Sequence, residues 1–218
     1  ATTATSNVAI SSGTMYAVPA DVALSSCVAI GNNALRGVGI TTAANHTVAI
    51  GLGALQLNTS GANNLAIGLN ALGVHTTGGR NIAIGPEAMD DTNAGSTSLA
   101  SEDNTFIGYR AGSGTWADAA SNGNIGIGNY TMDAAMNGAL GNVSLGHYAV
   151  SSLTTGDYNI GIGQNAGLSI TTGTNNIILG KLAGDTMTAT SNTIIIGFEA
   201  GQAINATGAD GTVAIGYK

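Results

Sequence analysis

The chain has 218 residues, enough for one large domain or two small ones, and only 8% of them are charged, against roughly 25% in ordinary globular proteins. Its formal net charge of -7 argues against nucleic acid as a partner, because a phosphate-binding surface needs clustered Lys and Arg. No apolar run approaches the roughly 20 residues of a membrane span, so we expect no membrane insertion.

A short motif recurs from the start of the chain to its end. It consists of Asn or Thr, an aliphatic residue, a mostly small residue, Ile or Leu, and Gly, and an Ala usually follows three positions after the Gly. The first copy, residues 7–11, carries Ser11 in the Gly position. The complete copies end at Gly31, Gly51, Gly68, Gly85, Gly108, Gly128, Gly146, Gly163, Gly180, Gly197 and Gly216. Their spacing of 17 to 23 residues is typical of a solenoid, and we expect a single repeat domain over residues 1–218 that is a fragment of a longer fibre.

The three residues before each Gly alternate as in a β-strand. Leu65 and Ile67, for example, share one face, and Ala66 lies on the other. Neither face carries a charge, and a strand that is apolar on both faces is buried on both. We therefore expect one face to line the coil interior and the small-residue face to pack against neighbouring copies of the chain around a threefold axis.

The segments between the motifs are rich in Thr, Gly and Asn, as in residues 153–159 and 170–176. These residue types favour turns. Each coil is therefore predicted to be a short strand, a tight corner, a second short strand and an exposed turn. The expected fold class is all-β, a parallel β-solenoid or β-roll of about twelve coils of 17–23 residues, assembled as a homotrimer.

An Asn opens most copies of the motif. In-register stacking of the coils would place these side chains about 4.8 Å apart, a spacing at which amide donors and acceptors pair along the stack. The predicted ladder consists of Asn64, Asn81, Asn104, Asn124, Asn142, Asn159 and Asn176. Cys27, the only cysteine, falls in the same column, so we expect it to be a buried small residue.

Strands such as "TVAIG" at residues 47–51, followed by small residues, resemble the head domains of trimeric autotransporter adhesins, which are parallel β-rolls of three chains. The longer pattern, in which "TTG" and "NN" precede the strand, is still more similar to the repeat arrays of bacteriophage tail fibres. The resemblance covers residues 7–216. The units are longer than those of adhesin heads, and no heptad stalk or membrane anchor follows them, which favours the fibre.

This resemblance implies a structural segment of a trimeric extracellular fibre in a virion tail. The implied partners are copies of the chain itself and a host cell-surface glycan or protein. The alternative is a bacterial surface adhesin head that binds matrix or glycan directly. A signal peptide or anchor in the full-length gene would favour the adhesin, and neighbouring virion genes would favour the fibre.

The segments "IGNNAL" and "IGLNAL" also match the hexapeptide unit of left-handed β-helix acyltransferases, which carry a catalytic His at a subunit interface. Such a helix needs three units per coil, and only one is clear here. His46, His75 and His147 occupy unrelated positions in the repeat, so we interpret them as exposed and expect no enzymatic activity and no cofactor. An ice-binding solenoid would need Thr ladders on a flat face, whereas the Thr pairs here fall in predicted turns.

We expect any ligand contact in two insertions, residues 86–104, which is the longest, and residues 109–123. The first contains the acidic residues Asp90, Asp91, Glu102 and Asp103. Carboxylates in one loop could collect Ca²⁺, but the spacing Asp-x-Asp-x-Asp is absent, so a solvated loop is the favoured interpretation.

The second insertion carries Trp116, the only Trp, close in sequence to two tyrosines. Exposed rings beside carboxylates are typical of sugar-binding surfaces, because rings stack on pyranose faces and acids bond hydroxyls. The candidate receptor contacts are Tyr109, Trp116, Asp118 and Tyr130. The alternative for Trp116 is an aromatic plug in the coil interior or at a subunit seam.

Overall fold

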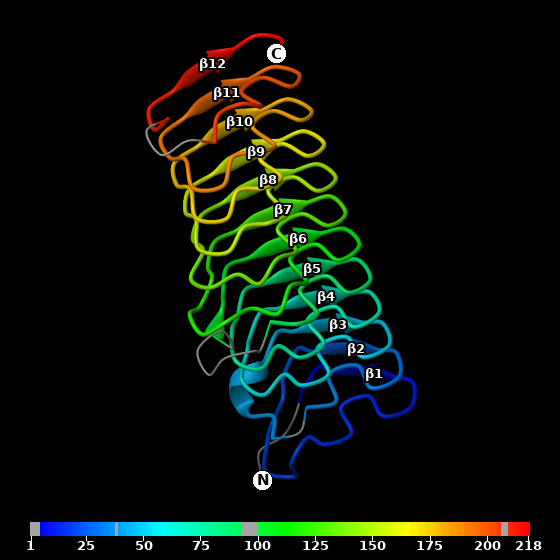
Figure 1. The fold of residues 1–218 in the computed structure, drawn as a ribbon. Helices are drawn as coiled ribbons and strands as arrows, with labels where there is room; N and C mark the ends of the chain where they lie inside the picture. The colour runs from blue at the N-terminus through cyan, green and yellow to red at the C-terminus, as the bar shows by residue number, and fades with distance from the viewer. Residues whose placement is uncertain (1–4, 38, 93–99, 206–208) are drawn as a thin grey trace.

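The structure, a computed structural model, describes residues 5–37, 39–92, 100–205 and 209–218. The chain winds into a stack of coils, and each coil contributes one short strand to a single parallel sheet that runs along the molecule (Figure 1). The strands are β1 (Val8–Ile10), β2 (Val28–Ile30), β3 (Val48–Ile50), β4 (Leu65–Ile67), β5 (Ile82–Ile84), β6 (Thr105–Ile107), β7 (Ile125–Ile127), β8 (Val143–Leu145), β9 (Ile160–Ile162), β10 (Ile177–Leu179), β11 (Ile194–Ile196) and β12 (Val213–Ile215). Strands pair in sequence order from β1 to β12, which confirms the expected all-β parallel solenoid.

The second strand predicted for each coil is not formed. Within the described ranges, the rest of every coil consists mainly of turns, bends and irregular backbone, with two isolated β-bridges, the 3₁₀-helix η1 (Thr42–Ala44) and a 3₁₀ residue at Ala100. The physical reason is the backbone at the corner after each strand. Asn70 and Leu72, at φ 52 and 51, are both left-handed, and a chain that turns twice within three residues cannot extend as a strand.

The two faces of the sheet are buried differently. Equivalent residues lie in register, so that Ala49 pairs with Ala66 and the central side chains form a column. These central side chains point into the coil, and both alanines are fully buried. Their neighbours face outward, since Ile125 and Ile127 are 40% and 38% exposed.

The small-residue face is therefore covered by the interior of its own coil. The prediction that this face packs against neighbouring copies is wrong. Leu72, at the corner of the coil that contains Ala66, is itself fully buried and fills the space opposite the strand, so only a small side chain fits at the strand centre.

Close approach of successive coils explains the Gly that ends the motif. At Gly68, where φ is +139, a Cβ atom would overlap the carbonyl oxygen of Gly85 in the next coil. Gly180, at φ +133, stands in the same relation to Gly197. Any L side chain at these positions would be strained and would also collide with backbone, which favours Gly in every coil that carries another above it.

The column of asparagines forms a hydrogen-bonded ladder in the coil interior. Oδ1 of Asn64 accepts from the backbone N–H of Asn81 at 2.9 Å, and Oδ1 of Asn81 accepts from that of Asn104 at 3.0 Å. The pattern continues through each of the other asparagines of the ladder as far as Asn176. The side-chain amides also donate to turn carbonyls, so the ladder fixes the register of strand and turn together.

Candidate functional site

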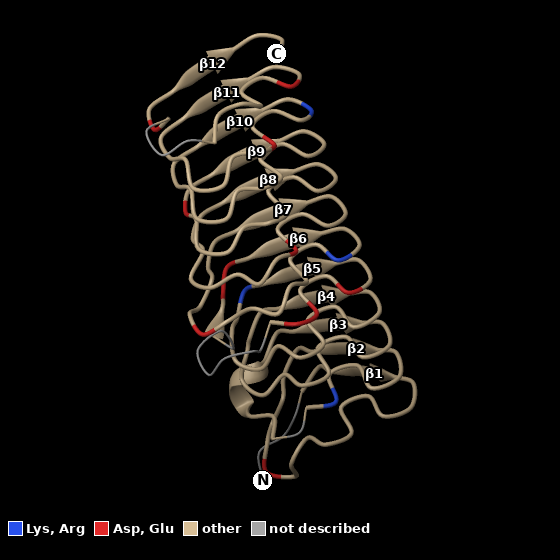
Figure 2. Ribbon diagram, in the orientation of Figure 1, with Lys and Arg blue, Asp and Glu red and all other residues tan. Residues whose placement is uncertain are grey.

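Charged side chains are few, and they gather on the turns and corners. Figure 2 shows them along the edges of the stack, and none of the twelve strands contains one. Among the described residues, no helix is long and apolar enough to cross a membrane.

The insertions at residues 86–104 and 109–123 meet in a pocket between the coils of β5 and β6. Its volume is about 290 Å³. It is lined by Val74, Glu87, Asp90, Asp91, Arg110, Ser113, Gly114 and Thr115. We call it the acid–arginine pocket.

Most polar groups of the acid–arginine pocket already have partners. Nε of Arg110 donates to Oγ of Ser113 at 3.3 Å and lies 3.7 Å from a carboxylate oxygen of Glu87. The Thr115 hydroxyl donates to the Asp91 carboxylate. These contacts tie the two insertions together across the coil boundary.

The Asp90 carboxylate is the exception in the pocket. Within the part of the chain that the structure describes, it makes no hydrogen bond and no ion pair. Burial raises the pKa of Asp90 to about 6, and the neighbouring charges of Glu87 and Asp91 add to the shift, while Arg110 opposes it. The pocket therefore holds one carboxylate that lacks a donor.

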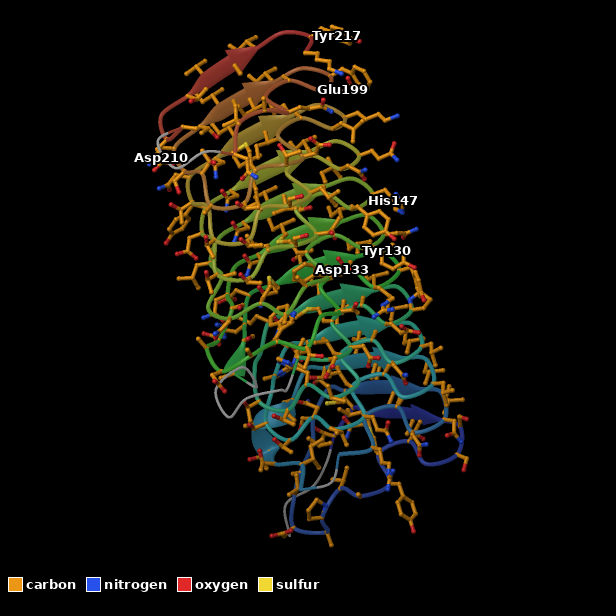
Figure 3. The ribbon with its side chains drawn as sticks, in the orientation of Figure 1. Tyr130, Asp133, His147, Glu199, Asp210 and Tyr217 are labelled. Atoms are coloured by element: carbon orange, nitrogen blue, oxygen red, sulfur yellow. The ribbon has the colours of Figure 1, made fainter. Side chains whose placement is uncertain are left out.

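A row of aromatic side chains continues from the pocket along the same corner. Tyr109 meets Tyr130 edge-to-face with ring centroids 5.3 Å apart, and Tyr130 stacks on Tyr148 at 4.8 Å and 6°. His147 packs against both Tyr130 and Tyr148. Figure 3 shows Tyr130 and His147 at the corner that follows the strands. We call these four residues the aromatic row.

The aromatic row and the pocket are neighbours. Burial and the adjacent Tyr109 and Tyr148 raise the pKa of Tyr130 above its usual value, and the charge of Arg110 acts against that shift. Arg110 and Tyr130 occupy equivalent positions, two residues after Gly108 and Gly128, on the consecutive coils of β6 and β7.

The structure brings together only part of the predicted receptor set. Tyr109, which is 37% exposed, and Tyr130 are in contact. Trp116 is fully buried, its ring packs edge-on against Phe106 with centroids 6.0 Å apart, and its indole N–H donates to the Gly112 carbonyl at 3.0 Å. It lies in the coil interior, the alternative placement considered from the sequence, and is not accessible to a receptor.

Asp118, the remaining predicted contact, is exposed at a turn and belongs neither to the pocket nor to the aromatic row. The residues that sequence reasoning missed are Glu87, Arg110, Ser113 and Thr115. Glu87 and Arg110 each stand two residues after a motif Gly, so an alignment of the repeats would have placed them side by side, whereas only the stacking of two coils of different length brings Ser113 and Thr115 to the same place.

The four acidic residues considered from the sequence, Asp90, Asp91, Glu102 and Asp103, separate into two sets. Glu102 and Asp103 pair with Arg80 at 2.8 and 2.6 Å, and the Arg80 guanidinium lowers the pKa of Asp103. Asp90 and Asp91 lie in the pocket instead. No group of three or more His, Cys, Asp or Glu side chains is placed to hold a metal ion in the described residues.

The histidines and the cysteine also occupy defined places. His46 and His147 are exposed as predicted, but His75 is fully buried, so the interpretation of all three as exposed is wrong for His75. Its ring lies in the interior corner, where Nε2 is 3.0 Å from the Gly78 carbonyl. Cys27 is a buried free thiol, which confirms its expected placement.

Comparison with known proteins finds no protein similar to this chain. No protein-family model matches the chain, and searches of curated proteins and of solved structures return no significant match.

Proposed function

We propose that the chain is a structural segment of a homotrimeric extracellular fibre, of the phage tail-fibre kind, that holds a host-binding region at a distance. The observation that supports this proposal is the outward face of the sheet. It is formed by the first and third residues of the twelve strands, and all are aliphatic except Thr105. We call this face the aliphatic strip.

The aliphatic strip is large for a surface in water. Twelve strands about 4.8 Å apart give a strip roughly 55 Å long and about 10 Å wide, or roughly 500 Å² of apolar surface. Leu145 and Ile162 are 45% and 38% exposed even though strands flank them on both sides. Apolar patches of this size mark contact surfaces on soluble proteins, and covering one contributes on the order of 10 kcal/mol before the cost of association.

Three copies of the chain would bury their aliphatic strips against one another. Parallel chains whose strips face a common axis would form one continuous apolar core, and the turns, which carry the charges, would remain in water (Figure 2). Such a rod combines coil-to-coil hydrogen bonds with burial between chains, so local opening is costly along its whole length. A rigid, protease-resistant spacer is the role that this construction serves.

The first experiment is the mass of the chain in solution by light scattering. We expect three times the 21.3 kDa of one copy. A twofold mass would mean that two chains assemble and not three. A single-copy mass would contradict the fibre proposal.

A pair of variants locates the contact. Ile127→Asp with Ile162→Asp places charge on the aliphatic strip without touching the coil interior, and we expect it to reduce the mass to one copy. The control, Thr155→Asp with Thr172→Asp, puts the same charge on exposed turns and should keep the threefold mass. If the Asp variant does not fold, Thr at 127 and 162, which copies Thr105, should weaken assembly in dilution series. Unchanged assembly in a folded strip variant would show that another face makes the contact.

The aromatic row favours a second candidate function, a bacterial surface adhesin head that binds glycan or matrix directly. Exposed rings on the side of the coil give such a head a binding surface of its own. The genes beside the full-length gene distinguish the two, since virion genes there would contradict the adhesin.

A further inference from the structure

We infer that the acid–arginine pocket and the aromatic row together bind an uncharged oligosaccharide. This inference rests on the proposed function, because it assigns a ligand class to the host-binding part of the fibre.

The first support is that pocket and row form one continuous surface. Arg110, at the rim of the pocket, occupies the second position after Gly108, and Tyr130 and Tyr148 occupy the same position in the next two coils. The strands of these three coils pair in register and the tyrosine rings are stacked, so the three residues follow one another along the stack. A ligand that enters the pocket can therefore extend along the rings, parallel to the fibre.

The second support is the mixture of chemical groups. A sugar presents hydroxyls that both donate and accept, and apolar C–H faces that pack on aromatic rings. The pocket offers the Arg110 guanidinium as a donor, the Ser113 hydroxyl as donor and acceptor, and the Asp90 carboxylate as an acceptor. Tyr109, which is 37% exposed, offers ring surface beside them. Few convergent polar groups beside aromatic surface are typical of small-molecule sites, and about 290 Å³ is close to the lower end of their volumes.

The third support concerns Asp90. Glu87 already faces Arg110 and Asp91 already accepts from Thr115, so Asp90 is the one carboxylate of the pocket without a donor. This half-buried carboxylate is still reached by solvent, and a ligand hydroxyl would replace water as its hydrogen-bond donor.

The charges in the pocket decide against acidic sugars. Three carboxylates face one guanidinium, so a sialic or uronic acid would meet net repulsion in a partly desolvated site. In a trimer the site is present three times, and simultaneous contacts would strengthen weak individual ones.

The experiment uses the full chain on an array of immobilised uncharged, amine-bearing and acidic oligosaccharides. We expect binding to uncharged members, and Tyr130→Ala and Asp90→Asn should each weaken it by roughly tenfold or more. The control is Tyr158→Ala, which removes an exposed ring, 60% accessible, from a different turn and should leave binding unchanged.

Binding confined to acidic or amine-bearing members, no binding to any member, or full binding by both variants would each overturn the inference. Light scattering on the same preparation separates it from the proposed function. A threefold mass without glycan binding contradicts only the site, whereas glycan binding by a single copy contradicts only the fibre.

Discussion

Coils near the two ends of the stack fill the same interior in opposite ways. In the coils of β2 to β5, the strand centre is Ala and the residue six positions later, at the corner, is Leu or Met. In the coils of β10 and β11, the strand centre is Ile and the corner residue is Gly. Ala66 with Leu72 and Ile178 with Gly184 represent the two arrangements, and the three side chains they contain are fully buried.

The comparison shows that the coil backbone is the same in both regions. The large interior side chain comes from the corner in the N-terminal coils and from the strand in the C-terminal coils. The corner is left-handed in both regions, since Leu72 has φ 51 and Gly184 has φ 53. Gly adopts this conformation without strain, whereas Leu does not, so the N-terminal coils accept strain at the corner to bring a large side chain inside. The C-terminal coils carry the volume on the strand instead.

The middle coils show how tightly the two positions are linked. Phe106 takes the strand centre of β6, and Gly112 takes the corner of that coil. A Cβ atom at Gly112 would lie 2.9 Å from the Phe106 ring, and one at Gly126, in the next strand, would lie 2.5 Å from it. A large residue at one position thus requires small residues at its neighbours within the coil and above it.

Exchanging the two arrangements of strand-centre and corner residues should give the largest change in the free energy of unfolding. Ile178→Ala removes the volume from a coil whose corner has no side chain, and we expect a loss of about 2–5 kcal/mol in the free energy of unfolding. Adding Gly184→Leu to that variant copies the N-terminal arrangement and should restore part of the loss. The measurement is denaturant unfolding at a fixed chain concentration.

The single variant Gly184→Leu is the control for this exchange. With Ile178 still present it overfills the coil, because a Cβ atom at Gly184 would already lie 3.6 Å from Cδ1 and Cγ2 of Ile178, and the rest of the Leu side chain would need the same space. The two substitutions should therefore be less harmful together than their separate effects predict. Simple additivity would show that strand centre and corner do not share one space.

A second interior position also divides the two regions. It is polar in three consecutive coils, as Asn58, His75 and Thr92, and apolar in later coils, as Leu153 and Ile170, all of them buried. Nε2 of His75 lies 3.0 Å from the Gly78 carbonyl oxygen and 3.2 Å from Nδ2 of Asn81, and Nδ1 lies 3.0 Å from the Thr92 hydroxyl. Burial lowers the pKa of His75 to about 4, although the bond to Gly78 opposes the shift.

His75→Asn should change how stability depends on pH. Between the usual pKa of 6.5 and the folded value of about 4, the unfolded chain binds a proton that the folded chain does not. The stability that neutral His75 provides is therefore present above pH 6.5 and lost as the pH falls toward 4, by on the order of 3 kcal/mol. Asn58 occupies the same position one coil earlier without titrating, so Asn is the matched replacement. Unfolding curves at pH 7 and pH 4 test this, and equal losses in both proteins would contradict it.

The repeat alone was enough to predict the sheet. The alternation around Ala66 predicts a strand, the period near seventeen predicts stacking in register, and the recurring Gly predicts a place without room for a side chain. What alternation cannot show is which face is interior. That choice depends on Leu72, six residues away, whose left-handed backbone turns it into the coil, and an aliphatic residue gives no sequence signal for that conformation.

The candidate site was predictable only in part. The insertions pointed to the right coils, and Tyr109 and Tyr130 do meet there. The pairing of Glu87 with Arg110 follows from the repeat, since each lies two residues after a motif Gly, but the approach of Asp91 to Thr115 depends on how a coil of 23 residues stacks on a shorter one, and sequence spacing does not fix it.

The smallest expected effect on stability concerns Asp90 in the acid–arginine pocket, and it differs in sign from the effects of the interior residues. Asp90 has a folded pKa of about 6, above its usual 3.8, so the folded chain holds a proton there that the unfolded chain releases. The stability linked to that proton is present below about pH 3.8 and lost as the pH rises through 6, which is opposite in sign to the effect of His75. Asp90→Asn should therefore stabilise the chain at pH 7 by about 1 kcal/mol, a value discounted for the solvent that reaches the pocket, and should change little at pH 4.

Asp91→Asn is the control for that variant, because Asp91 already accepts from Thr115 and its substitution should not stabilise the chain. If the Asp90 variant is more stable at pH 7 and also binds glycan more weakly, the Asp90 carboxylate lowers the stability of the coil and contributes to ligand binding. Interior positions such as Ile178 behave in the opposite way, since their side chains contribute to stability and to no contact outside the coil. No gain at pH 7 would show that Asp90 is already satisfied, and the argument that it awaits a ligand hydroxyl would fail with it.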